Sequence, residues 1–562
     1  MSTKAPAEPT SNFEFPEAPT PASAEWPGTP IGASNTITRT KSRTAVFDKN
    51  LDADPQKRAR LLARAAVAGG DTAVRTLDVV IHGIRVRAIT NSPHLYDFWR
   101  ENWYGVEEWQ RLTGNPASAE PRCIAYALTG VEDEPEAAYY SREANTIIFF
   151  NTAYYGQLKS WVLGAVGRVL AEEYGIHSIH GACVALDQRG ILYIAPTGTG
   201  KSTSSYGLMQ APGARFHSDD WVYIRYMYPT IDGRLIAPTR IETADGAIIQ
   251  GYRCARWLEQ PETPEATVSG LGVRDEPLSV PLAQLDRSQP PAAYAYLSEK
   301  IFYLRSNLVE NFPEAAYQLL QAKLENVPTV RPSFIQQHQG LLHDLDRYLL
   351  SAGAARGRDF FAQKPEAERH GMLARFFAFN NARAMLSIGE IFPPEQVFLD
   401  PLEPVRLTHV FLLKRDFADD MVLQTLDLHS FIDRLLIGLT PDGKHEIAYN
   451  AYRAVDDAEE AAYVAALEDQ ARQSGASLYA VMEQQDQAPG TLYQEVELFR
   501  QLHRAAGCYD LNTILEQDPA VTSRKQAVER TIALIGAVVS QMRGTFSATL
   551  STYAQLVQPM EP

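Results

Sequence analysis

The chain of 562 residues is too long for one ordinary domain, and its 45% hydrophobic and 21% charged residues are typical of a globular protein with a sizeable core. A formal net charge of −16 argues against sequence-independent nucleic-acid binding, which requires a basic face to replace counterions. The four cysteines are far apart and include no CxxC pair, so the pattern predicts reduced thiols rather than a disulfide framework or a zinc–cysteine site.

No membrane segment is expected. The chain has no basic-then-apolar signal at its N-terminus. Its longest apolar run near the end, residues 532–539, is too short to span a bilayer. We therefore expect a soluble cytoplasmic protein without a nucleic-acid or membrane partner.

The pattern along the chain predicts an α/β protein in four parts. Residues 1–45, rich in Pro, Ala, Ser, Thr and Glu, are expected to form a disordered tail. An N-terminal α/β lobe is expected at 46–175. A nucleotide-binding lobe is expected at 176–454, with a helical insertion at about 255–375. The remaining residues, 455–562, are expected to form a helical C-terminal region, which is the candidate surface for a protein partner.

Hydrophobic periodicity and turn signals predict the individual elements. Helices are expected at 55–68, 93–103, 157–173, 314–375 and 428–439, and after about 455. Strands are expected at 77–81, 84–89, 146–150, 182–186, 191–194, 214–217, 221–224 and 408–413. The proline-rich segment 255–295 is expected to be mostly loop.

The clearest motif is Ala195-Pro196-Thr197-Gly198-Thr199-Gly200-Lys201-Ser202, between an apolar strand and a helix-compatible run. In this context the backbone N–H groups and the start of the helix bind the phosphates of a nucleotide. Lys201 is expected to bridge the β- and γ-phosphates, and the Ser202 hydroxyl to ligate a metal. The expected nucleotide-binding residues are Thr197, Gly198, Thr199, Gly200, Lys201, Ser202 and Thr203.

Two adjacent carboxylates, Asp219 and Asp220, follow soon after this loop. One helix, a Pro-Gly turn and a short strand fit between the loop and the pair, so the pair is expected to return to the loop at the edge of the sheet. One carboxylate can bind a metal, directly or through water, and the other can accept the proton of an attacking hydroxyl. His180, at the start of the strand 182–186, is a further candidate by its position.

These blocks resemble the core of the phosphoenolpyruvate carboxykinase superfamily, which includes the HPr kinase/phosphorylases. The shared pattern is a His before a hairpin, a Gly-x-Gly-Lys-Ser/Thr loop and an Asp-Asp pair. The ATP-type carboxykinases are similar over more of the chain. Their Thr-Ala-Tyr-x-Gly-Glu-x-Lys-Lys segment resembles residues 152–160, and their Asn-Thr-Arg-Ala segment resembles residues 381–384.

The resemblance implies a bipartite carboxykinase-like fold that binds ATP between its lobes together with Mg²⁺ or Mn²⁺. It implies that His180, Asp220 and Ser202 surround the metal and that Arg383 contacts the transferring phosphoryl group. The candidate catalytic side chains are accordingly Asp219, Asp220, Arg383 and His180. Arg305 is a further candidate for binding an anion.

Two departures from the ATP-type carboxykinases decide between the possible activities. Ser160 replaces the second lysine of the Lys-Lys pair, and the Gly-Arg-Ser-Pro-Lys-Asp segment that holds the carboxylate substrate is not found. The pattern therefore favours a kinase that phosphorylates a hydroxyl of a small molecule or a protein. An ATP-dependent carboxykinase and a nucleotide-binding scaffold without catalysis are the alternatives, and the sequence does not identify the acceptor.

Overall fold

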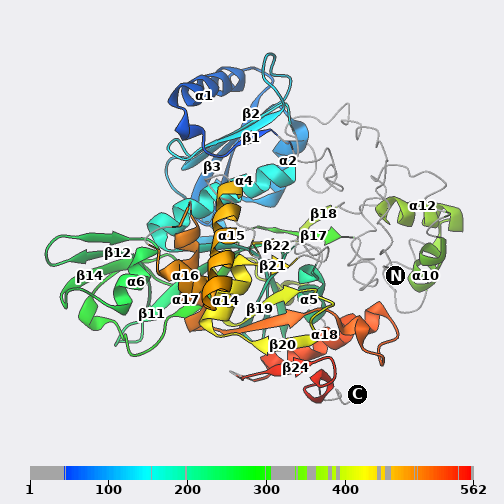
Figure 1. Ribbon diagram of the computed structural model, residues 1–562. Coiled ribbons are helices and arrows are strands. Elements are labelled where there is room, and N and C mark those ends of the chain that lie inside the picture. Colours follow the sequence, from blue (N-terminus) through cyan, green and yellow to red (C-terminus); the bar gives the residue numbers. More distant parts are fainter. Residues whose placement is uncertain are drawn as a thin grey trace.

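A computed structural model describes most of the chain. The described residues are 44, 46–152, 155–196, 199–209, 211–297, 299–305, 336, 339–350, 362–377, 383–387, 393–439, 445–447, 449, 457–485, 488–489, 491–541 and 544–557. The protein is a mixed α/β chain with two large sheets and helices around them (Figure 1). Apart from Thr44, the predicted disordered tail lies outside the described residues.

The first sheet has seven strands in the order β1-β6-β7-β5-β3-β2-β4. The strands are β1 (Phe47–Asp48), β2 (Arg75–Ile81), β3 (Ile84–Thr90), β4 (Tyr104–Gly105), β5 (Cys123–Leu128), β6 (Ala137–Ser141) and β7 (Thr146–Phe150). The predicted hairpin at 77–89 is confirmed. Its turn is His82-Gly83, and both residues have positive φ.

Alternation along the strands gives this sheet two apolar faces. In β7, Ile148 and Phe150 pack with helix α1 (Pro55–Gly69). Ile147 and Phe149 point to the other face and pack with α2 (Pro93–Asn102) and α4 (Tyr155–Val169). Helix α3 (Val106–Thr113) joins the same face, and a π-helical turn, Leu170–Tyr174, extends α4. The helices predicted at 55–68, 93–103 and 157–173 are thus confirmed.

The second sheet has thirteen strands, and its main path is β15-β14-β12-β11-β8-β9-β19-β23-β20-β24. Three further strands pair beside this path: β10 with β8, β13 with β12, and β16 with β11 and β19. The strands are β8 (His177–Leu186), β9 (Arg189–Ile194), β10 (Ala214–Ser218), β11 (Trp221–Pro229), β12 (Leu235–Thr243), β13 (Ile248–Gln250), β14 (Ala266–Leu271), β15 (Pro277–Pro281), β16 (Ala292–Leu297), β19 (Val405–Lys414), β20 (Met421–Thr425), β23 (Gly507–Asn512) and β24 (Ser547–Thr549).

The centre of this sheet is a parallel trio, β9, β19 and β23, with helices on both faces. Phe411 and Leu413 of β19 pack with α5 (Lys201–Leu208) and α18 (Arg524–Val539). Val410 and Leu412 pack on the other side with α14 (Leu428–Leu436), α15 (Asp457–Ser474), α16 (Leu478–Glu483) and α17 (Leu492–Ala505). Strands buried on both faces read as continuous apolar runs, which is why 191–194 and 408–413 were recognisable in the sequence.

The prediction that 255–295 is mostly loop is wrong. After α6 (Arg253–Glu259), the segment contains β14, β15 and β16. Pro277 and Pro281 begin and end β15, the outermost strand, where a residue without an N–H group costs no ladder hydrogen bond. Proline therefore marked an edge strand here rather than a loop. The predicted helical insertion is helical in its described later part, in α10 (Gln339–Leu349) and α12 (Glu366–Phe377).

The prediction that everything after about 455 is helical is also wrong, because β23 and β24 belong to the second sheet. Strand β23 contains Asp510, a buried carboxylate that pairs with Lys414 at 2.8 Å and with Arg434 at 3.3 Å. This partnered charge interrupts the apolar pattern by which a central strand is recognised. The long helices α17 and α18, on either side of β23, also favour a helical prediction for the segment between them.

Two structural observations bear on the expectations drawn from composition. The four cysteines are buried and form no disulfide. Among the helices that the structure describes, none combines the length and the apolar character needed to cross a membrane.

Gly251 is a position where the second sheet contacts the end of α4, and it provides a test of the fold. Its φ is +58°, and an added Cβ would lie 1.9 Å from the carbonyl oxygen of Glu172. Gly246 has a similar φ of +85° but open space around it. Gly246→Ala should cost about 1–2 kcal/mol of stability through backbone strain alone. Gly251→Ala should cost more, roughly 3 kcal/mol or above, because backbone must move. Equal losses of thermal stability in the two variants would contradict this packing.

Candidate functional site

The predicted strand–loop–helix context of the phosphate motif is confirmed. Strand β9 ends at Ile194 and helix α5 begins at Lys201. Gly200 caps the helix with a φ of +100°, a conformation that glycine adopts without strain, and it has no side chain to occupy the start of the helix. Lys201 is 8% exposed and Thr203 is 7% exposed. Thr197 and Gly198 lie outside the described residues, as does the side chain of Ser202.

The loop is held in place by Thr513, which directly follows strand β23 and lies 314 residues after Thr199 in the chain. The Oγ1 of Thr199 donates to the carbonyl oxygen of Pro196 at 2.9 Å. Thr513, directly after β23, donates its hydroxyl to the carbonyl oxygen of Thr199 at 3.1 Å and is also 3.1 Å from that of Lys414. Because Thr513 is so distant in sequence, nothing near the motif indicated this contact.

The acidic pair returns to the loop as predicted. Strand β10 pairs with β8, the chain bends at Asp219 and Asp220, and β11 pairs with β8 in turn. Both aspartates are buried, at 3% and 5% exposure. The backbone N–H of Gly181 donates to the carbonyl oxygen of Asp220 at 3.0 Å, which fixes the bend against β8. The pair thus occupies the bend that joins β10 to β11, and both of these strands pair with β8.

The side chain of Asp220 is the point on which the neighbouring basic side chains converge. The Nε2 of His180 is 3.1 Å from Asp220 Oδ1, and the Nζ of Lys201 is 4.0 Å from the same oxygen. The ammonium group of Lys159, in α4, donates to Asp220 Oδ2 at 2.7 Å. Three of the residues brought together, His180, Lys201 and Asp220, were candidates from the sequence. Lys159 was not, although it lies within the segment 152–160 that carries the family resemblance.

A second carboxylate completes the cluster. Glu299 is buried and accepts a hydrogen bond from Lys159 at 2.8 Å. Its Oε1 accepts one from Asn102, the last residue of α2, at 3.2 Å. Sequence analysis missed Glu299, which follows β16 without a motif around it. A signal for Lys159 existed, because it is a lysine within the apolar face of a predicted helix, between Leu158 and Trp161.

Burial raises the pKa of both carboxylates and the nearby ammonium group of Lys159 lowers it, but the balance differs between them. Burial disfavours ionisation of Asp220, but the attraction of Lys159, followed by His180 and Lys201, holds its pKa well below the usual value. At Glu299 burial prevails and raises the pKa to about 7, with Lys159 opposing the shift and Asp220 adding to it. Asp220 is therefore ionised at neutral pH, whereas Glu299 is close to its midpoint.

The cluster contains side chains of the kinds that can bind a divalent cation. A carboxylate oxygen of Asp220 and an imidazole nitrogen of His180 lie 3.1 Å apart, and Asp219 immediately precedes Asp220 in the chain. Lys159 and Lys201 together only offset the acidic groups, so a triphosphate entering here would need further positive charge. The carboxylate oxygens suit Mg²⁺ or Mn²⁺, and the imidazole nitrogen of His180 suits a transition metal such as Mn²⁺ better than Mg²⁺.

The two candidate arginines are neighbours in the fold. Strands β17 (Ile301–Arg305) and β18 (Arg383–Ser387) pair antiparallel, and Arg305 is directly opposite Arg383. Strand β17 begins two residues after Glu299. The side chains of Arg305 and Arg383 lie outside the described part of the structure, so the predicted contact of Arg383 with a phosphoryl group stays a prediction.

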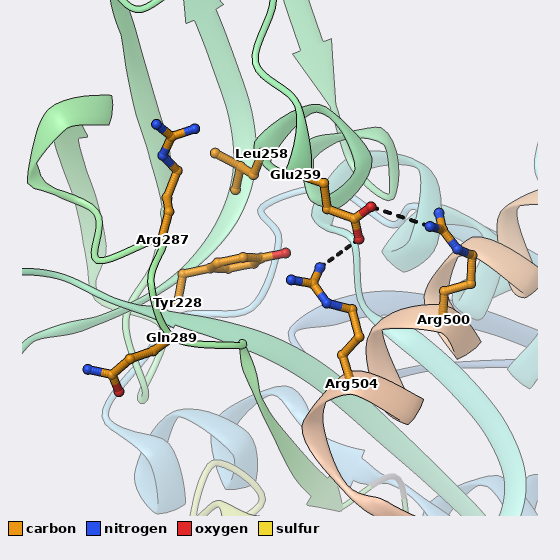
Figure 2. Close-up of a pocket in the computed structure, with 7 residues that line it drawn as sticks. All are labelled: Tyr228, Leu258, Glu259, Arg287, Gln289, Arg500 and Arg504. Carbon is orange, nitrogen blue, oxygen red and sulfur yellow. Dashed lines mark hydrogen bonds and ion pairs between the residues drawn. The ribbon is translucent and has the colours of Figure 1, made fainter. Parts of the chain in front are cut away.

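A pocket of about 600 Å³ lies away from this cluster. It is lined by Tyr228, Leu258, Glu259, Arg287, Gln289, Arg500 and Arg504 (Figure 2). Tyr228 is eight residues from Asp220 along β11, a separation of about 26 Å in an extended strand. Figure 2 shows Glu259 between Arg500 and Arg504, with ion pairs of 3.3 and 2.6 Å. These pairs join α6 to α17, and we assign the pocket no part in phosphate binding.

Comparison with protein-family models gave no match for this chain, and comparison with curated proteins gave none either.

Glu299 should make the stability of the protein depend on pH. Its pKa is higher in the folded state than in the unfolded chain, so the folded state retains a proton that the unfolded state has lost. As the pH rises from about 5 to 8, stability should therefore fall in the wild type relative to Glu299→Gln, by up to about 3 kcal/mol. Thermal unfolding of both proteins across this range measures the difference. Parallel curves would contradict the assignment.

Proposed function

We propose that the protein is an ATP- and Mg²⁺-dependent phosphotransferase that passes the terminal phosphoryl group to a hydroxyl of a small molecule or a protein. The observation that carries this proposal is the buried cluster around Asp220, which adjoins Lys201 at the start of α5. A phosphate-loop motif is weak evidence by itself, because the sequence pattern is short. A buried carboxylate, an imidazole and a lysine at the mouth of that loop supply the charges that phosphoryl transfer requires.

The fold supports the same proposal at a coarser level. The cluster draws Asn102 and Lys159 from helices on the first sheet, and His180 and Asp220 from the second. A site between two lobes is what the resemblance to phosphoenolpyruvate carboxykinases implies. We propose a carboxykinase-like fold on this basis, with the nucleotide bound at this cluster between the two lobes.

Each side chain can be given a part in the reaction. The α5 N-terminus and Lys201 would bind the phosphates, and Arg383 would contact the transferring group. Ser202, Asp220 and His180 would hold Mg²⁺, whose charge offsets that of the phosphoryl oxygens. Lys159 keeps Asp220 ionised. Asp219, buried beside it, would accept the proton of the attacking hydroxyl.

One observation favours an ATP-dependent carboxykinase as the second candidate. The first lysine of the carboxykinase Lys-Lys pair is present here as Lys159, and its ammonium group reaches Asp220. Ser160 replaces only the second lysine, so this helix still supplies one lysine to the cluster. A coupled assay with ATP and oxaloacetate separates the two activities. Steady formation of phosphoenolpyruvate would contradict the kinase proposal. ATP binding without any turnover would instead favour a nucleotide-binding scaffold.

Lys201→Ala tests whether this loop binds the nucleotide. The variant should bind ATP more weakly and lower turnover by at least about a hundredfold, because a preorganised cation is lost. Its thermal stability should change little, since Asp220 keeps Lys159 and His180 as partners. Lys57→Ala, at a partly exposed ion pair with Asp48 in the N-terminal lobe, is the matched control and should bind ATP and turn over as wild type. Unchanged ATP affinity in Lys201→Ala would show that the nucleotide binds elsewhere.

Asn substitutions at the acidic pair test the division of labour between the two aspartates. Asp220→Asn should raise the Mg²⁺ concentration required for activity. Asp219→Asn should leave that requirement nearly unchanged and lower the rate by about a hundredfold to ten-thousandfold, as expected for a lost general base. Rates measured against Mg²⁺ concentration decide the matter.

Thermal melting of both variants is the control, because a buried ion pair is disturbed in Asp220→Asn. If a folded Asp219→Asn variant changes only the metal requirement, Asp219 is not a base, and the proposed mechanism loses its proton acceptor.

A further inference from the structure

Helices α10 and α12 form a two-helix unit at the side of the molecule (Figure 1). A buried ion pair fixes their spacing. Arg369 of α12 contacts both carboxylate oxygens of Asp346 of α10, with Nη2 donating to Oδ2 at 2.7 Å. The same guanidinium donates through Nη1 to the carbonyl oxygen of Lys364 at 2.6 Å. Since a bidentate pair of this kind restricts distance and angle together, the facing residues of the two helices have defined positions.

Three side chains of types that can ligate a metal ion converge beside this ion pair. His343 lies on α10, and Glu366 and His370 lie one turn apart on α12. One ligand atom from each of the three lies within 4.8 Å of the other two. The Nε2 of His370 is 3.8 Å from Glu366 Oε1 and 3.8 Å from Asp346 Oδ2.

His370 provides the second observation that points to a ligand. The residue is only 9% exposed. Within the described part of the chain, its Nε2 is buried and has no hydrogen-bond partner. A buried imidazole nitrogen without a hydrogen bond is unfavourable, and a metal ion held between His370 Nε2 and Glu366 Oε1, 3.8 Å apart, would satisfy it.

We infer that α10 and α12 hold a divalent transition-metal ion, with Zn²⁺ as the expected occupant, ligated by His343, Glu366 and His370. Two imidazoles among three protein ligands favour Zn²⁺ over Mg²⁺ or Ca²⁺, which take mostly oxygen ligands. Tetrahedral zinc brings neighbouring ligand atoms to about 3.4 Å. The ligand atoms lie up to about 1.4 Å further apart than this, and the exposed side chains of His343 and Glu366 can close the difference by rotamer changes, whereas the ion pair already fixes the helices.

This site is separate from the phosphate loop and independent of the proposed phosphotransferase activity. It contains none of the residues of the Asp220 cluster. A bound ion would join α10 to α12 and stabilise them in proportion to the logarithm of the free metal concentration. The fourth ligand position would be open to water.

Zn²⁺ titration of the full-length protein by calorimetry, with excess Mg²⁺ present, tests the inference. His343→Ala and His370→Ala should each weaken Zn²⁺ binding by more than about tenfold, and Glu366→Gln should weaken it as well. His429→Ala is the matched control, because His429 is exposed and lies on α14. The binding should also persist in His180→Ala, which removes the imidazole of the other candidate metal site.

The outcomes are distinguishable even if a core variant misfolds. Loss of Zn²⁺ binding in His343→Ala and Glu366→Gln, both at exposed positions, with unchanged melting in the absence of metal supports the site. Unchanged binding in His343→Ala and His370→Ala, loss confined to His180→Ala, or no binding by the wild type at micromolar Zn²⁺ would each overturn it.

Discussion

The ionised, buried carboxylate of Asp220 is the constraint on which the candidate site depends. Burying an isolated carboxylate costs several kcal/mol, so it requires partners with good geometry. Lys159, His180 and Lys201 are those partners, and they come from α4, β8 and α5. The same contacts therefore join a helix of the first sheet to the strand and the phosphate loop of the second. A site that binds a highly charged ligand needs such preorganised charge, since the protein then reorganises little on binding.

The surrounding fold holds the loop and the charged cluster in fixed positions. The phosphate loop follows β9, which is buried between β8 and β19, and Thr513 at the end of β23 holds the carbonyl of Thr199. On the other side, Asn102 and Lys159 fix Glu299, whose pKa of about 7 makes the charge of the cluster adjustable near neutral pH. The parallel centre of the second sheet thus sets the position of the loop, and the helices of the first sheet set the charges opposite it.

The sequence predicted the parts of the site that are local in the chain. From the strand 191–194 through Lys201 to Asp219, each element follows its predecessor through a short turn, and periodicity and turn residues suffice. Glu299 and Thr513 could not be predicted, because each reaches the site only through tertiary pairing far along the chain. The same reason explains β23, whose buried Asp510 is tolerable only beside Lys414, and β15, whose prolines are tolerable only at an edge.

The most direct test of the central claim is a crystal structure with a non-hydrolysable ATP analogue and Mn²⁺, in which anomalous scattering locates the metal. The account predicts one Mn²⁺ in contact with Asp220 and with the triphosphate, and Lys201 on the phosphate oxygens. A triphosphate bound away from α5, or a metal on the triphosphate that makes no contact with Asp220 or His180, would contradict it.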